Sequence, residues 1–165
     1  MKKNVFIALA LFVINAVKGQ DFPFTPEHWE VSGQGHVFEQ FKGQPSLYMS
    51  RGNAVLKGMT FVTGTLEYDV FVTERRGFVG VKFRIEDSAN LEDFYLPPHQ
   101  SGNPDANQYS PVINGLSAWQ LYYGEGFAKA VSYKMDAWNH IKVVVAQKRA
   151  EVFINDMEIP ALIIP

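Results

Sequence analysis

Short runs of alternating apolar and polar residues limit most strongly how this chain can fold. Residues 65–72 read TLEYDVFV and residues 78–85 read FVGVKFRI. Successive side chains of a strand point to opposite faces of a sheet, so such runs predict strands with one buried face. Thirteen glycines and nine prolines separate the runs, and helical spacing is absent after residue 19. The sequence predicts an all-β fold of two packed antiparallel sheets, with strands near 36–41, 46–50, 65–72, 78–85, 117–123, 138–147 and 149–155.

The first 19 residues differ in character from the remainder. Two lysines follow the initiator methionine, and an apolar run over residues 5–17 is interrupted only by Asn15. This arrangement is typical of a secretory signal peptide, and we expect cleavage after Gly19. The apolar run is too short for a comfortable membrane span and no other segment approaches its length, so no stable span is expected after cleavage. The interpretation is a secreted protein, or one of the periplasm or cell envelope.

The net charge limits the partners to be expected, and the cysteine content limits how the fold can be stabilised. Removing residues 1–19 takes three of the 15 basic residues and none of the 17 acidic ones, which leaves 12 against 17 and a net charge of −5. A surface with this charge does not favour nucleic acid or an anionic membrane as a partner. The chain has no cysteine, so burial alone must stabilise the exported fold. The lysine-rich start and the lack of cysteine suit a bacterial protein.

One stretch combines aromatic rings, amide side chains and a histidine. Residues 94–123 read FYLPPHQSGNPDANQYSPVINGLSAWQLYY. Aromatic rings can cover the C–H surface of a sugar, and amides can exchange hydrogen bonds with its hydroxyl groups. Residues 97–111 show no strand pattern, and we expect them to form an ordered loop at the rim of a binding site. This stretch predicts a sugar-sized ligand.

A polar strand face supplies a second part of the expected site. Lys82 and Arg84 alternate with Val81 and Phe83. In a curved sheet such a face can line a concave groove, where the forked guanidinium of Arg84 would hold a pair of hydroxyls or a carboxylate. The alternative is an ordinary solvated strand face. The hypothesis places Arg84, His99 and Trp119 around one hollow.

Several motifs carry a family resemblance over residues 22–165. They are HQSG at 99–102, QY at 108–109, NG at 114–115, WNHIKVVV at 138–145 and VFIND at 152–156. With these motifs the chain resembles secreted bacterial concanavalin A-like lectin/glucanase domains, which are laminin-G-like jelly rolls. The group to which it is most similar is labelled family 16 glycoside hydrolase-like or 3-keto-disaccharide hydrolase-like.

The resemblance implies one domain over 22–165, folded as a two-sheet antiparallel jelly-roll sandwich. Relatives continue past the segment that matches 159–165 into a closing strand, so we expect the domain to be truncated after Pro165. Relatives also carry an arginine where this chain has Pro97, so one charged contact to ligand is expected to be missing. The implied function is carbohydrate binding, and the expected ligand contacts are Arg84, Tyr95, His99, Gln108, Tyr109, Asn114, Trp119 and Gln120.

Glu67 and Asp69 are the candidate catalytic pair. They lie two residues apart in a predicted strand and therefore share a face, whereas a retaining glycosidase holds its two carboxyl groups about 5 Å apart. The third carboxylate of the glucanase pattern is absent, and a solvated outer face is the preferred interpretation. A glycoside hydrolase-like enzyme is the alternative function, and a structural adhesion module without a sugar site is the second alternative.

Metal binding and other cofactors are not predicted. Asn103, Asp105 and Asn107 alternate in a way that suggests calcium, but no glutamate follows in the register of an EF-hand, which favours a turn-rich loop. His99 has no second histidine at the spacing of a zinc site. It remains a candidate acid, base or hydrogen-bonding partner.

Overall fold

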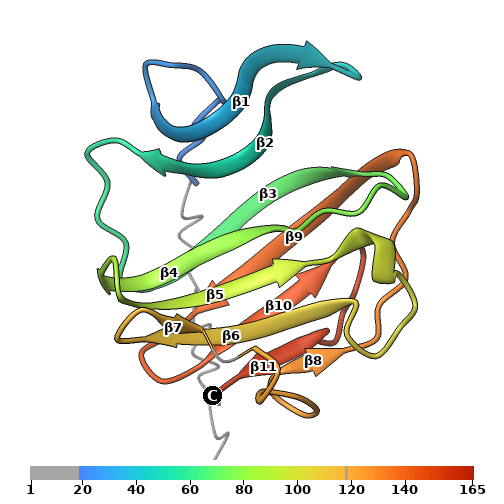
Figure 1. Cartoon of the computed structure of the whole chain (residues 1–165). Coiled ribbons are helices and arrows are strands. Elements are labelled where there is room, and N and C mark those ends of the chain that lie inside the picture. The colour runs from blue at the N-terminus through green and yellow to red at the C-terminus, as the bar shows by residue number, and fades with distance from the viewer. Residues whose placement is uncertain (1–18, 118) are drawn as a thin grey trace, which may run out of the picture. The chain divides into compact units, whose positions relative to one another are not determined.

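The computed structural model describes residues 19–117 and 119–165 and contains antiparallel sheets of two, four and five strands (Figure 1). The prediction of an all-β antiparallel protein is confirmed. The predicted signal peptide lies, except for Gly19, outside the described residues. The chain divides into two compact units, Met1–Met59 and Thr60–Pro165. In the part of the chain that the structure describes, no helix has the length and hydropathy needed to cross a membrane.

The first unit contains one long hairpin. Strand β1 (Trp29–Phe41) pairs antiparallel with β2 (Gln44–Leu56), from Trp29 opposite Leu56 to Phe41 opposite Gln44. The connecting residues Lys42 and Gly43 both have positive φ, 48° and 85°, as a two-residue hairpin turn of the primed type requires. The strands predicted at 36–41 and 46–50 are therefore parts of two longer strands.

Two glycines allow the strands of this hairpin to approach closely at its centre. Gly33 lies opposite Gly52, with φ of 121° and 141° respectively. A Cβ atom on Gly33 would lie 2.2 Å from the carbonyl oxygen of Arg51. Only glycine, which has no Cβ atom, can adopt this backbone conformation and also allow so close an approach of the two strands.

The second unit contains the other two sheets. The four-stranded sheet has the order β11-β10-β9-β3 and consists of β3 (Gly64–Val72), β9 (Ala137–Val145), β10 (Ala150–Ile154) and β11 (Leu162–Ile164). The five-stranded sheet has the order β4-β5-β6-β7, with β8 also paired to β6. Its strands are β4 (Val79–Asp87), β5 (Asn90–Leu96), β6 (Asn107–Ile113), β7 (Leu116–Ser117) and β8 (Ala128–Lys129). A single 3₁₀ turn, η1 (Pro98–Gln100), follows β5.

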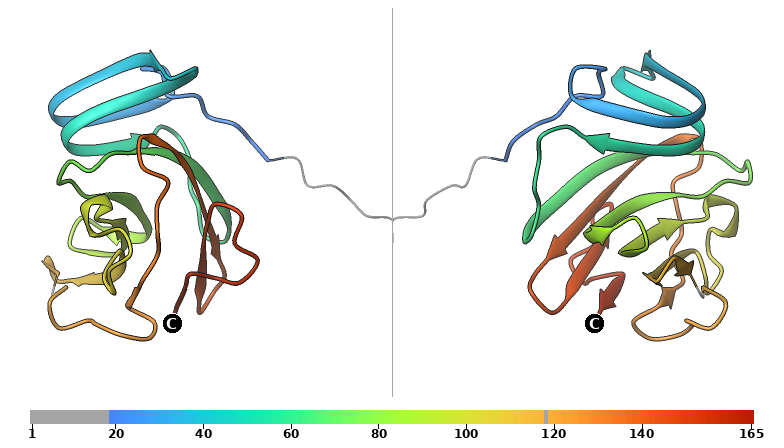
Figure 2. Two further views of the ribbon diagram at one scale, coloured as in Figure 1. Left: turned by 90° about the vertical axis from the view of Figure 1, so that its right-hand side faces the viewer. Right: turned by 60° about the vertical axis from the view of Figure 1, so that its left-hand side comes forward.

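The two sheets of the second unit share one hydrophobic core. Strand β9 contributes Ile141, Val143 and Val145, while β5 contributes Phe94 and Leu96, and all five side chains are buried. Figure 2 shows the two sheets on either side of this core. The alternation that predicted a strand over 138–147 therefore reflects one apolar face of β9 turned toward the opposite sheet, whereas β5 was not predicted from the sequence.

The strand predicted over 117–123 is wrong. Strand β7 ends at Ser117, and residues 119–121 form a turn. The alternating residues Trp119, Leu121 and Tyr123 are 50%, 84% and 65% exposed, so no buried face holds them in a sheet. Apolar alternation predicts a strand only where one face is covered.

The loop predicted over 97–111 is also partly wrong. It contains η1 and then the first half of β6, whose residues 107–110 are buried. The Asn107 side chain donates a hydrogen bond of 2.8 Å to the Lys129 carbonyl oxygen. Polar side chains can occupy a buried strand when they find such partners, and this strand therefore lacks the apolar pattern of the others.

Candidate functional site

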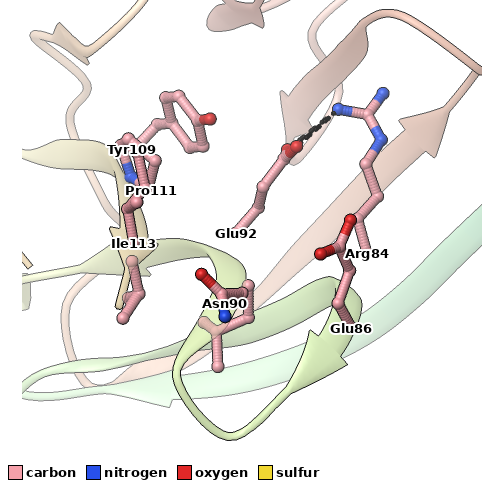
Figure 3. Close-up of a pocket in the computed structure, with 9 residues that line it drawn as sticks. Arg84, Glu86, Asn90, Glu92, Tyr109, Pro111 and Ile113 are labelled. Atoms are coloured by element: carbon pink, nitrogen blue, oxygen red, sulfur yellow. Dashed lines mark hydrogen bonds and ion pairs between the residues drawn. The ribbon is translucent and has the colours of Figure 1, made fainter. Parts of the chain in front are cut away.

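A pocket of about 280 Å³ lies on the five-stranded sheet (Figure 3). Strands β4, β5 and β6 supply its lining residues, which are Arg84, Glu86, Asn90, Leu91, Glu92, Tyr109, Pro111, Val112 and Ile113. Figure 3 shows Arg84, Glu86 and Glu92 on one side and Tyr109, Pro111 and Ile113 on the other. The pocket thus has a charged wall and a largely apolar wall.

A β-bulge positions Arg84 in the charged wall. The pairing of β4 with β5 shifts register between Phe83 and Asp87, and Arg84 has a φ of 48°. A bulge redirects the side chains that follow it. The Arg84 Nη1 atom donates to both carboxylate oxygens of Glu92, each at 2.9 Å. Nη2 donates to the Ala146 carbonyl oxygen at 2.6 Å, in the connection between β9 and β10.

This ion pair is well shielded from water. The Arg84 and Glu92 side chains are 20% and 21% exposed. Charge-assisted hydrogen bonds that hold both carboxylate oxygens also fix the orientation of each partner. The Arg84 contacts therefore give the charged wall a defined shape and connect it to the four-stranded sheet.

A network of hydrogen bonds fixes Asn90 in the pocket. Its Nδ2 atom donates to both carboxylate oxygens of Asp87 at 3.1 Å, and its Oδ1 atom accepts a bond of 3.0 Å from the Asn114 backbone N–H. The bonds from the Asn90 side chain and the Ala89 backbone N–H lower the pKa of the Asp87 carboxyl group. Asn90 is thus held by groups on both of its sides.

Tyr109 forms the aromatic part of the opposite wall. Its ring stacks on Phe127 with a centroid separation of 5.8 Å, and Phe127 stacks on Tyr122 at 5.0 Å. Burial, reinforced by the negative charge of Glu92, raises the pKa of Tyr109 to about 12. The phenol therefore stays neutral at physiological pH and can both donate and accept a hydrogen bond.

The structure brings some of the predicted ligand contacts together. Arg84 and Tyr109 line the pocket. Asn114 forms the two-residue turn between β6 and β7 with Gly115, both at positive φ, and contacts Asn90 through its backbone. Its role in the pocket is therefore to hold Asn90.

The other predicted contacts lie elsewhere. Tyr95 and His99 both make edge-to-face contacts with Phe78, at 6.1 and 5.6 Å between ring centroids. Gln108 is buried and pairs with Tyr95 across β5 and β6. Trp119 and Gln120 occupy the exposed turn after β7. The pocket that contains Arg84 is lined by neither His99 nor Trp119.

His99 retains one unexplained feature. Its Nδ1 atom is buried and has no hydrogen-bond partner in the described chain. Neither the pocket of β4, β5 and β6 nor a second pocket lined by Val131 and Asn155 includes His99 among its lining residues.

The sequence did not single out Glu86, Asn90 or Glu92. Glu92 becomes recognisable only when the register of β4 against β5 is known, because the bulge brings it to Arg84. Asn90 carried a weaker signal, since an aspartate three residues before an asparagine at the end of a strand is typical of a tight turn.

Glu67 and Asp69 lie on the exposed face of β3 with a histidine from β9. The His140 Nδ1 atom is 2.8 Å from Asp69 Oδ1, and its Nε2 atom is 3.7 Å from Glu67 Oε2. The three side chains are between 36% and 51% exposed. One imidazole thus contacts both carboxylates on the exposed face of the sheet.

The described residues contain no group of three or more His, Asp or Glu placed to hold a metal ion. The side chains suggested for calcium do not converge. Asn103 donates to the Gln100 side-chain oxygen at 2.6 Å, whereas Asn107 is buried and bonds Lys129.

No family model, curated protein or solved structure matches this chain. The comparisons therefore identify no family. The structure shows an all-β protein with several antiparallel sheets.

Proposed function

We propose that this chain is an exported carbohydrate-binding protein and that the pocket of β4, β5 and β6 is its sugar site. The observation that carries the proposal is the combination of a neutral phenol, a fixed amide and an ion pair around one hollow. Sugars present alternating hydroxyl groups and C–H surfaces, and this lining offers partners for both.

The size of the pocket supports a small ligand. Its volume of about 280 Å³ lies just below the range of roughly 300–1,000 Å³ that is common for small-molecule sites. A ligand of one or two sugar units would fit such a space. Because Arg84, Glu92 and Asn90 are already held by hydrogen bonds, little side-chain entropy would be lost when the ligand binds.

The proposed fold follows the family resemblance. Two antiparallel sheets around one core are consistent with a concanavalin A-like jelly roll, and we assign that architecture to the second unit as a proposal. Export rests on the sequence of residues 1–19. The contact of His140 with both Glu67 and Asp69 gives no support to a hydrolase that uses these carboxylates.

A blocked pocket provides the test. Ile113 lines the pocket and is 56% exposed, so Ile113→Trp would fill the site without disturbing the core. The matched control is Ile163→Trp, at a position on β11 that is 48% exposed and does not line the pocket. A glycan array identifies ligands, and titration calorimetry then compares the variants.

We expect Ile113→Trp to weaken binding at least about tenfold, equivalent to about 1.4 kcal/mol. Ile163→Trp should bind like the unaltered protein. The proposal is wrong if the array shows no sugar ligand, or if both variants bind a ligand equally well.

A further inference from the structure

The pocket carries an excess of negative charge. Its lining contains the carboxylates of Glu86 and Glu92 and the guanidinium of Arg84, which gives a net charge of −1. Lys148 and Arg149 follow the Ala146 carbonyl that Arg84 contacts, but neither lines the pocket, and Arg149 is paired with Glu151.

The positive charge of Arg84 is already used within the protein. Its guanidinium holds both oxygens of Glu92 and the Ala146 carbonyl oxygen. An anionic ligand would have to compete with Glu92 for this cation. Arg84 is therefore suited to shaping the wall and poorly suited to attracting an acid.

The negative charge of Glu86, unlike the positive charge of Arg84, is not used within the protein. It is exposed and lies beside Arg84 at the pocket (Figure 3). Among the described residues its side chain makes no hydrogen bond or ion pair. Its carboxylate is thus available to a ligand group that donates hydrogen bonds, and a charged donor makes the strongest bonds of this kind.

We propose that Glu86 makes the pocket select sugars that carry a free, protonated amino group over their N-acetylated and acidic counterparts. This inference rests on the proposed function of the same pocket. An ammonium group beside Glu86 gains a charge-assisted hydrogen bond, whereas a sugar carboxylate meets the net negative charge of the lining. Because Glu86 is exposed, the expected preference is modest, about fivefold.

The probes are three β-1,4-linked disaccharides compared by titration calorimetry at about pH 6, where a sugar amine is protonated and a glutamate is ionised. They are diglucosamine, di-N-acetylglucosamine and diglucuronate. The first two differ only in N-acetylation, and the third, which has the same ring configuration and linkage, reports the response to negative charge. The protein carries net negative charge as a whole, so nonspecific attraction of the cationic probe must be separated from binding in the pocket.

A matched pair of variants makes this separation. Glu86→Gln removes one negative charge from the pocket, and Glu158→Gln removes one from another exposed position that does not line it. We expect diglucosamine to bind about fivefold more tightly than its acetylated counterpart and diglucuronate to bind most weakly. Glu86→Gln should remove the preference, Glu158→Gln should keep it, and added salt should reduce it.

The outcomes distinguish this inference from the proposed function. Equal binding of the amino and acetylated probes, blocked by Ile113→Trp, would overturn the amino preference and leave a sugar site in place. A preference that survives Glu86→Gln, or that falls equally in Glu158→Gln, would also overturn it. If neither these probes nor the array yields a ligand, both proposals fail.

Discussion

Replacement of Asn139 by aspartate tests how the second unit is held together. Asn139 is fully buried and makes four hydrogen bonds. Its Nδ2 atom donates to the carbonyl oxygens of Lys134 and Ala137 at 2.8 and 3.2 Å. Its Oδ1 atom accepts from the Lys134 backbone N–H at 2.9 Å and from the Asn155 side chain at 3.0 Å. These bonds join the start of β9 to the end of β10.

Asn139→Asp keeps the shape of the side chain and removes both donated bonds when the carboxyl group is ionised. A buried acceptor left without its donor costs roughly 1–3 kcal/mol, so we expect a loss of about 2–6 kcal/mol in the free energy of unfolding at pH 7. Typical domains have about 5–15 kcal/mol in total, so the loss would be large.

The loss should depend on pH. A protonated carboxyl group can donate one of the two bonds, so folding raises the pKa of the introduced aspartate above its unfolded value of about 3.9. The native state then binds more protons than the unfolded state, and the variant loses stability as pH rises from below that value through the folded pKa.

Urea unfolding followed by tryptophan fluorescence at pH 7 and at about pH 3 measures the loss of stability and its dependence on pH. The control is Asn103→Asp at an exposed position, which should change stability by no more than about 0.5 kcal/mol. The reasoning is refuted if Asn139→Asp costs less than about 1 kcal/mol at pH 7, or if its cost relative to the unaltered protein is the same at both pH values.

Two further substitutions test single buried groups. Tyr133→Phe removes a hydroxyl that donates to the Ala106 carbonyl oxygen at 2.6 Å, and should lower the free energy of unfolding in urea by about 1–3 kcal/mol; a change below about 0.5 kcal/mol would contradict this. Burial raises the pKa of Asp93 above its ordinary value of 3.8. The stability that the protonated carboxyl group contributes is therefore fully present below that pH and is lost as the pH rises through the folded pKa. Asp93→Asn should therefore gain thermal stability relative to the unaltered protein between about pH 3 and pH 7, and an advantage confined to low pH would contradict the assignment.

Strand β9 was predicted because one of its faces covers the core, whereas β5 covers the same core and was not predicted. In β9 the apolar residues Ile141, Val143 and Val145 all face the opposite sheet. Burial of this one face explains both the alternation in the sequence and the strand in the structure. The pattern failed at residues 117–123 because the apolar residues Trp119, Leu121 and Tyr123 are exposed to solvent. It failed again at the start of β6, where hydrogen bonds replace apolar contacts for Asn107 and Ser110.

The candidate site was predictable only in part. Arg84 and Tyr109 were identified because an arginine in a strand and a tyrosine among amides are unusual enough to notice. Their partner Glu92 was not, because a bulge determines which side chains meet, and a bulge leaves little trace in the sequence. The expected grouping of His99 with Arg84 required a strand register that no local pattern specifies.

Some pocket residues also support the fold, and others do not. Arg84 bonds Glu92 on β5 and Ala146 in the connection beyond β9, so its replacement would disturb both the pocket wall and the contact between the sheets. A loss of binding in an Arg84 variant would therefore not distinguish a ligand contact from a structural one. Glu86 and Ile113 are exposed at the same pocket and contribute no side chain to the buried core, so their substitution changes the site while the fold remains.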